Sequence, residues 1–150
     1  QKSPFELSGG QKRRVAIAGV MAMHPRVLVL DEPAAGLDPE GRDTILSQIR
    51  DYHEKTGITV LLVSHSMEEI ASNVDRLIVM EKGTAVMTGA PSEVFSHAAE
   101  LVSMGLNVPC MTQVLLRLQQ LGVNVPASAY TVEQAADLLE PLLKGGAQIC

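Results

Sequence analysis

The stretch that decides the fold is Val27-Leu28-Val29-Leu30-Asp31-Glu32-Pro33, in which four aliphatic residues lead directly into two acids and a proline. A short, continuous aliphatic run predicts a strand buried on both faces, as in a parallel sheet. A second run of this kind, Thr59–Val63, is followed two residues later by His65. Ligands of open α/β sheets bind beyond the carboxyl ends of the strands. Asp31, Glu32 and His65 are therefore the first candidates for a functional site.

Helices and strands are predicted to alternate around these two runs. Pro25 ends the first helix and Gly57 closes the second. We expect helices over residues 11–23, 39–54, 67–72, 91–95, 98–104, 111–121 and 132–143, and a hairpin of strands 76–80 and 84–88 joined at 81–83. The alternation predicts an α/β fold with a parallel sheet and flanking helices over residues 1–90. Residues 91–150 are predicted to form a small helical appendix.

Composition narrows the function classes. The chain has 150 residues, 46% of them hydrophobic and only 3% aromatic, which predicts a globular protein with an aliphatic core. The net charge of −5 argues against nucleic-acid binding. Cys110 and Cys150 fit neither a disulfide scaffold nor a metal motif. No apolar run reaches the roughly 20 residues needed to cross a bilayer, so we expect any membrane role to be exerted through a partner protein.

A glycine-rich turn precedes the first helix. Gly9 and Gly10 would let backbone N–H groups approach a phosphate closely, the helix N-terminus adds partial positive charge, and the Ser8 hydroxyl can donate a hydrogen bond. The alternative is an ordinary glycine-rich turn. Lys12-Arg13-Arg14, directly downstream, is interpreted as a solvated helix face near this turn.

The strand-end residues have chemistry that suits a nucleotide. Asp31 can hold Mg²⁺ through water, and Glu32 can orient or deprotonate a water molecule. His65 can hydrogen-bond a terminal phosphate. The alternatives are two solvated acids that end a strand and a structural histidine. Asp38, which precedes Pro39, is fully explained as a helix N-cap.

Four motifs in this order resemble those of the ATP-binding cassette (ABC) family, a branch of the P-loop NTPase fold: residues 7–11 (LSGGQ), 27–32, 35–38 (AGLD) and His65. The resemblance implies that Asp31 helps hold Mg²⁺, that Glu32 is the general base and that His65 contacts the γ-phosphate. It further implies that Ser8, Gly9, Gly10 and Gln11 clasp ATP bound to a second ATPase subunit, and that Asp38 links the two sites across the dimer.

A finer resemblance, to the ATPases of energy-coupling factor and cobalt-type importers, lies in residues 33–42 (PAAGLDPEGR), 89–95 and 106–109. It implies a peripheral ATPase on the cytoplasmic face of the cell membrane, with ATP and Mg²⁺ as cofactors. The expected partners are a second ATPase subunit, identical or paralogous, a transmembrane coupling subunit and a substrate-binding membrane protein. The expected solute is a vitamin or a transition-metal ion.

The phosphate-binding loop G-x-x-x-x-G-K-[ST] is absent from these 150 residues. Because the chain opens at Gln1 close to the LSGGQ motif, we expect it to be a C-terminal portion of an ABC ATPase that does not hydrolyse ATP by itself. Two other hypotheses stay open, a non-transport ABC ATPase of translation or DNA maintenance and an inert interaction module.

Overall fold

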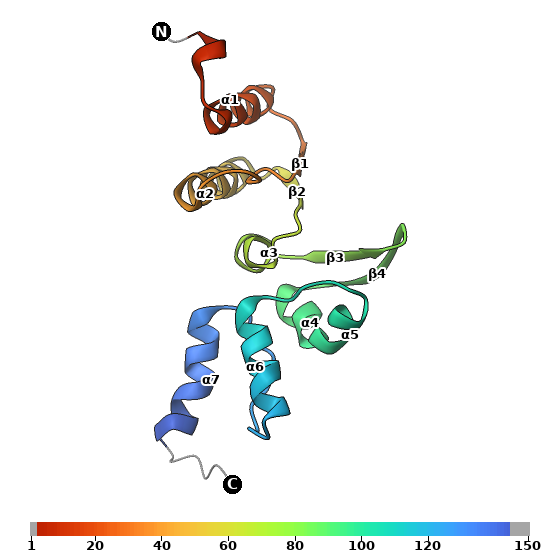
Figure 1. The fold of residues 1–150 in the computed structure, drawn as a ribbon. Helices are drawn as coiled ribbons and strands as arrows, with labels where there is room; N and C mark the ends of the chain where they lie inside the picture. The colour runs from red at the N-terminus through yellow and green to blue at the C-terminus, as the bar shows by residue number, and fades with distance from the viewer. Residues whose placement is uncertain (1–2, 145–150) are drawn as a thin grey trace. The chain divides into compact units, whose positions relative to one another are not determined.

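The computed structural model of the protein describes residues 3–144. The chain divides into two compact units, residues 1–65 and residues 66–150. Figure 1 shows the elements in chain order, from α1 at the red end to α7 at the blue end. The first unit contains η1 (Pro4–Glu6), α1 (Gly9–Met21), β1 (Val27–Asp31), α2 (Pro39–Thr56) and β2 (Thr59–Val63). The second contains α3 (Met67–Asn73), β3 (Leu77–Glu81), β4 (Thr84–Gly89), α4 (Pro91–Ser96), α5 (Ala98–Ser103), α6 (Cys110–Gln120) and α7 (Val132–Lys144).

All the predicted helices and strands are present, with ends that differ from the predictions by two residues at most. The fold class is confirmed, although the described strands form two separate two-stranded sheets. In the first, β1 and β2 are parallel and paired from Val27 opposite Thr59 to Asp31 opposite Val63. In the second, β3 and β4 form the predicted antiparallel hairpin.

The core of the first unit lies on one face of the β1–β2 pair. Leu28 and Leu30 point to this face and are 2% and 8% exposed, packed with the α2 side chains of Ile45, Leu46 and Ile49. Ile17 and Met21 of α1 pack against the same cluster. Burying these aliphatic side chains, at about 1.5–3 kcal/mol each, is the main contribution to the stability of this unit.

The prediction that both strands are buried on both faces is wrong for the residues that the structure describes. Along β1 buried and exposed residues alternate, and Val29 is 60% exposed. On the same face of β2, Leu61 and Val63 are each 47% exposed. The physical reason is that successive strand residues point to opposite faces, while α1 and α2 supply their apolar side chains to one face only.

Helix α2 has the predicted cap at each end, although its last residue, Thr56, lies two residues beyond the predicted end. Asp38 is its N-cap, with Pro39 at the first helical position, and the Gly41 N–H donates to Asp38 Oδ1 at 3.1 Å. Gly57 follows the last turn with a φ of +67° in the left-handed region, and its N–H donates to the His53 carbonyl at 2.8 Å. A left-handed residue at this position is most often glycine, which has no Cβ to clash.

The second unit has two clusters of buried side chains. The first joins the β3–β4 hairpin to α3, α4 and α5 and centres on Val94, Phe95, Leu101 and Val108, each no more than 2% exposed. The second lies between α6 and α7 and centres on Leu115, which is fully buried. These two helices form the C-terminal part of the predicted appendix. The domain boundary expected near residue 90 falls inside this unit and stays a prediction.

Within residues 3–144, no helix combines the length and the apolar character that crossing a bilayer requires.

Candidate active site

The parallel pairing of β1 and β2 brings the candidate residues of the two strands to one edge. Asp31 is the last residue of β1 and stands opposite Val63, the last residue of β2. The pairing continues one residue further, because the Glu32 N–H donates to the Val63 carbonyl at 2.8 Å. Residues 32 and 65, which follow the two strands, are therefore held next to each other by the sheet.

Glu32 and His65 are in direct contact. Glu32 Oε1 accepts a hydrogen bond from the His65 backbone N–H at 2.9 Å and lies 2.7 Å from His65 Nδ1. An ionised carboxylate can only accept, so the tautomer that fits this contact is the one with an Nδ1–H donor. The Glu32 side chain is 30% exposed and that of His65 is 85% exposed. The imidazole can therefore receive a ligand from solvent while its Nδ1 edge stays on the carboxylate.

The backbone of Glu32 is unusual. Its φ is +49°, in the left-handed region that residues with a Cβ adopt only rarely. Such conformations cost of the order of 1–3 kcal/mol and persist where surrounding contacts enforce them. Here the N–H is held by Val63 and the side chain by His65. The turn directs the carboxylate of Glu32 toward the end of β2, away from the line of β1.

Asp31 presents a different environment. It ends β1 on the exposed face of the strand pair. Within residues 3–144, no cluster of three or more His, Cys, Asp or Glu side chains could form a protein-only metal cage. An exposed carboxylate at a strand end nonetheless fits Mg²⁺, which is commonly held by one or two carboxylates together with water and substrate phosphates.

The turn before α1 is a complete helix cap. Ser8 Oγ accepts from the Gln11 N–H at 3.2 Å, and Gln11 Oε1 accepts from the Ser8 N–H at 3.0 Å. This reciprocal pair is a capping box. Gly9 and Gly10 are the first two helical residues, whose N–H groups have no partner within a helix. The ordinary-turn alternative thus accounts for Ser8 and Gln11, and the role of all four residues in clasping a phosphate stays a prediction.

Gly10 has a packing reason as well. A Cβ added at this position would lie 2.9 Å from Leu37 Cδ2. The absence of a side chain lets the first turn of α1 approach the loop between β1 and α2, which ends at Asp38. The N-cap role predicted for Asp38 is confirmed, and its role across a dimer stays a prediction.

Arg13 corrects the interpretation of Lys12-Arg13-Arg14 as a solvated helix face. The Arg13 guanidinium donates to three backbone carbonyls of the loop after β1: Ala35 at 2.9 Å, Asp31 at 3.4 Å, and Glu32 through a short contact. Lys12 and Arg14 are exposed. Spacing could have indicated this, because Arg13 lies three residues after Gly10 and four before Ile17, on the helix face that meets the core.

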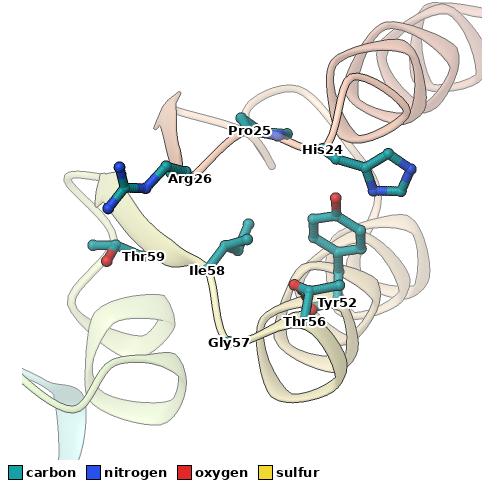
Figure 2. Close-up of a pocket in the computed structure, with 8 residues that line it drawn as sticks. All are labelled: His24, Pro25, Arg26, Tyr52, Thr56, Gly57, Ile58 and Thr59. Atoms are coloured by element: carbon teal, nitrogen blue, oxygen red, sulfur yellow. Dashed lines mark hydrogen bonds between the residues drawn. The ribbon is translucent and has the colours of Figure 1, made fainter.

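A cleft of about 440 Å³ lies in the first unit, away from these residues. Figure 2 shows its lining, which comes from the segment before β1, the last turns of α2 and the start of β2: His24, Pro25, Arg26, Tyr52, Thr56, Gly57, Ile58 and Thr59. The Tyr52 hydroxyl donates to the Met21 carbonyl at 2.8 Å and thereby links α2 to the end of α1. Because the cleft lies at the amino ends of the strands, it is separate from the Glu32–His65 edge.

Comparisons with known proteins find ABC transporter proteins that are similar to this chain. The ABC transporter family model matches residues 1–35. The energy-coupling factor transporter ATP-binding protein EcfA2 of Clostridium tetani is 51% identical over 149 residues, which are 99% of this chain and 52% of that protein. A Bacillus cereus protein of the same name is 45% identical over 151 residues, again 99% of this chain and 52% of the relative. The chain thus spans about half the length of these relatives.

Two solved structures of ATP-binding cassette proteins are also similar to this chain. CbiO1 of Clostridium perfringens, described as part of the ABC transporter complex cbiONQ, is 39% identical with a TM-score of 0.60 over 81% of this chain and 45% of that one. The ATP-binding cassette MJ0796, solved as a dimer in a post-hydrolysis state with ADP and Pi, is 30% identical with a TM-score of 0.54 over 59% of this chain and 38% of that one. With four ordered motifs, their positions in the fold and these matches together, the chain belongs to the ABC ATPase family.

Proposed function

We propose that this chain supplies the signature, acidic strand end and histidine switch of an ATP-hydrolysing subunit in an energy-coupling factor type transporter. The observation that carries the proposal is the 2.7 Å contact between Glu32 Oε1 and His65 Nδ1 at the carboxyl edge of two parallel strands. The 51% identity to an energy-coupling factor ATP-binding protein supports the transporter class.

Glu32 is the residue to which we assign water activation. A carboxylate that is only 30% exposed and anchored by two donors from one residue has a restricted orientation. Restriction of this kind favours a general base, because the carboxylate must lie within hydrogen-bonding distance of the proton that it removes. Asp31 would hold Mg²⁺, which, when bound, neutralises charge on the phosphates.

His65 is assigned to the γ-phosphate. Its ring is 85% exposed while Nδ1 faces Glu32, so Nε2 is the atom that would donate to a phosphate oxygen. A ring that donates from both nitrogens carries both protons. Hydrolysis would remove the phosphate partner of Nε2, and the histidine would then sense the loss of that charge.

The remaining site residues are assigned to a second subunit. The first turn of α1, with Ser8, Gly9, Gly10 and Gln11, would present N–H groups and a helix N-terminus to ATP held by the partner ATPase. Asp38, which caps α2 with Oδ1, would reach across the dimer. The proposed assembly is two ATPase subunits with a transmembrane coupling subunit and a substrate-binding membrane protein, on the cytoplasmic face of the membrane. It would power uptake of a vitamin or a transition-metal ion and bind no nucleic acid.

The test uses a hybrid in which this chain replaces the matching half of the Clostridium tetani relative, purified with a second ATPase subunit of that transporter. We expect magnesium-dependent ATP turnover. The Glu32→Gln variant should lower kcat by about 10²–10⁴-fold, the usual contribution of a general base, and should trap an ATP-bound dimer. Glu54→Gln, an exposed carboxylate at the end of α2, is the matched control and should keep full turnover. Near wild-type turnover in Glu32→Gln would refute the assignment.

A second measurement concerns the chain by itself. Since the 150 residues contain no G-x-x-x-x-G-K-[ST] loop, we propose that the purified chain lacks meaningful ATPase activity. Magnesium-dependent phosphate release by the chain alone, removed by Glu32→Gln, would contradict this proposal.

A further inference from the structure

Arg13 lies outside the four motifs, yet its side chain contacts the segment that carries the proposed catalytic acid. Its guanidinium donates from Nη1 to the Ala35 carbonyl at 2.9 Å and from Nη2 to the carbonyls of Asp31, at 3.4 Å, and Glu32. We propose that Arg13 is a positioning residue, which holds the Glu32 backbone in its left-handed conformation and couples the first turns of α1 to the catalytic edge. This inference rests on the proposed function of Glu32.

The first step of the argument is the conformation of Glu32. Its φ of +49° is unfavourable for a residue with a Cβ, so contacts must hold it. Its N–H bonds Val63, its side chain bonds His65, and its carbonyl accepts from Arg13. Of these three contacts, the one from Arg13 is made by the side chain of a helix, α1.

The second step is the chemistry of the side chain. A guanidinium is planar and has five N–H donors in a fixed fork, whereas a lysine ammonium is a compact charge on a flexible stem. Three carbonyl oxygens of one turn, at residues 31, 32 and 35, converge on the two terminal nitrogens of Arg13. Lysine could not reproduce this set of simultaneous contacts.

The third step is the location of Arg13 on α1. It lies one helical turn after Gly10, where an added Cβ would be 2.9 Å from Leu37 Cδ2, and one turn before Ile17, which packs on the core. The start of α1, which carries the proposed phosphate clasp, thus lies close to the 31–37 loop at Gly10 and is hydrogen-bonded to that loop by Arg13. Movement of that helix start would be transmitted to Glu32 through Arg13.

The experiment uses the same hybrid ATPase and its partner subunit. Arg13→Ala and Arg13→Lys should each lower kcat by about ten- to a hundredfold, the size expected when a reacting group is misplaced by about 1 Å, while the KM for ATP changes less than about twofold. Lys12→Ala, which removes the neighbouring exposed charge of α1, is the control and should leave kcat unchanged. If Arg13→Ala does not fold, Arg13→Lys, which keeps the charge and an aliphatic stem, decides the matter.

A double-mutant cycle separates positioning from plain structural support. If Arg13 acts through Glu32, adding Arg13→Lys to Glu32→Gln should lower the residual turnover less than twofold. If Arg13→Lys lowers turnover by the same factor in the wild-type and the Glu32→Gln background, the inference is overturned. Unchanged kcat in both Arg13→Ala and Arg13→Lys would overturn it as well. A large effect of Glu32→Gln with no effect of Arg13→Lys refutes the positioning role alone. Loss of the Glu32→Gln effect itself refutes the proposed function instead.

Discussion

Asp38 has an observed role as a helix cap and a proposed role at the dimer, and one set of substitutions can separate the two. Its Oδ1 accepts the Gly41 N–H at 3.1 Å and caps α2, the 18-residue helix that supplies Ile45, Leu46 and Ile49 to the core. Its carboxylate is also the group proposed to act across the dimer. Alanine removes the cap and the charge, whereas asparagine keeps a capping oxygen and removes only the charge.

The magnitudes follow from this geometry. Loss of an N-cap oxygen costs about 1 kcal/mol, and loss of a negative charge at a helix N-terminus costs about 0.5 kcal/mol more. We therefore expect Asp38→Ala to lower the free energy of unfolding by about 1.5 kcal/mol and Asp38→Asn by about 0.5 kcal/mol. With a slope of about 2 kcal/mol/M, the urea midpoint of Asp38→Ala should fall by about 0.7 M.

The assay is urea unfolding of the 150-residue chain followed by far-ultraviolet circular dichroism, together with ATP turnover of the hybrid. If the carboxylate acts at the dimer, Asp38→Asn should lose most of the turnover while keeping most of the stability. An unchanged urea midpoint in Asp38→Ala would refute the capping argument. Full turnover in Asp38→Asn would leave capping as the sole role of Asp38.

Two further predictions concern stability. Gly57→Ala should lower the free energy of unfolding by about 1–2 kcal/mol, because a φ of +67° brings a Cβ into conflict with the backbone; an unchanged urea midpoint would contradict this. Leu115→Ala should lower it by about 2–5 kcal/mol, because the fully buried side chain between α6 and α7 would leave a cavity. Calorimetric unfolding measures this effect. Val114→Ala, on the same helix and 41% exposed, is the control and should have the smaller effect.

The element order was predictable because local signals are strong in this chain. Pro25, Asp38, Pro39 and Gly57 mark helix ends by their backbone chemistry, and the structure places the ends of α1 and α2 within two residues of the predictions. The proximity of Glu32 and His65 was predictable too, since both follow strands that pair in parallel.

The orientation of individual side chains was less accessible. The aliphatic run of β1 does not indicate which of its residues a helix covers. Val29 is exposed because α1 and α2 pack on the other face of the strand, which only the structure shows. The left-handed backbone of Glu32 has no sequence signal, because a glutamate at this φ is stabilised by contacts from residues distant in the chain.

By itself, the sequence determined the strands, the helix boundaries and the residues that meet at the carboxyl edge, because caps, turns and strand periodicity act over a few neighbouring residues. Only the tertiary structure decided the contacts of Arg13, which in the sequence is one of three adjacent cations. Its partners are backbone carbonyls 18 to 22 residues away. Every residue has such a carbonyl, so the side-chain sequence does not reveal a contact of this kind until the chain has folded.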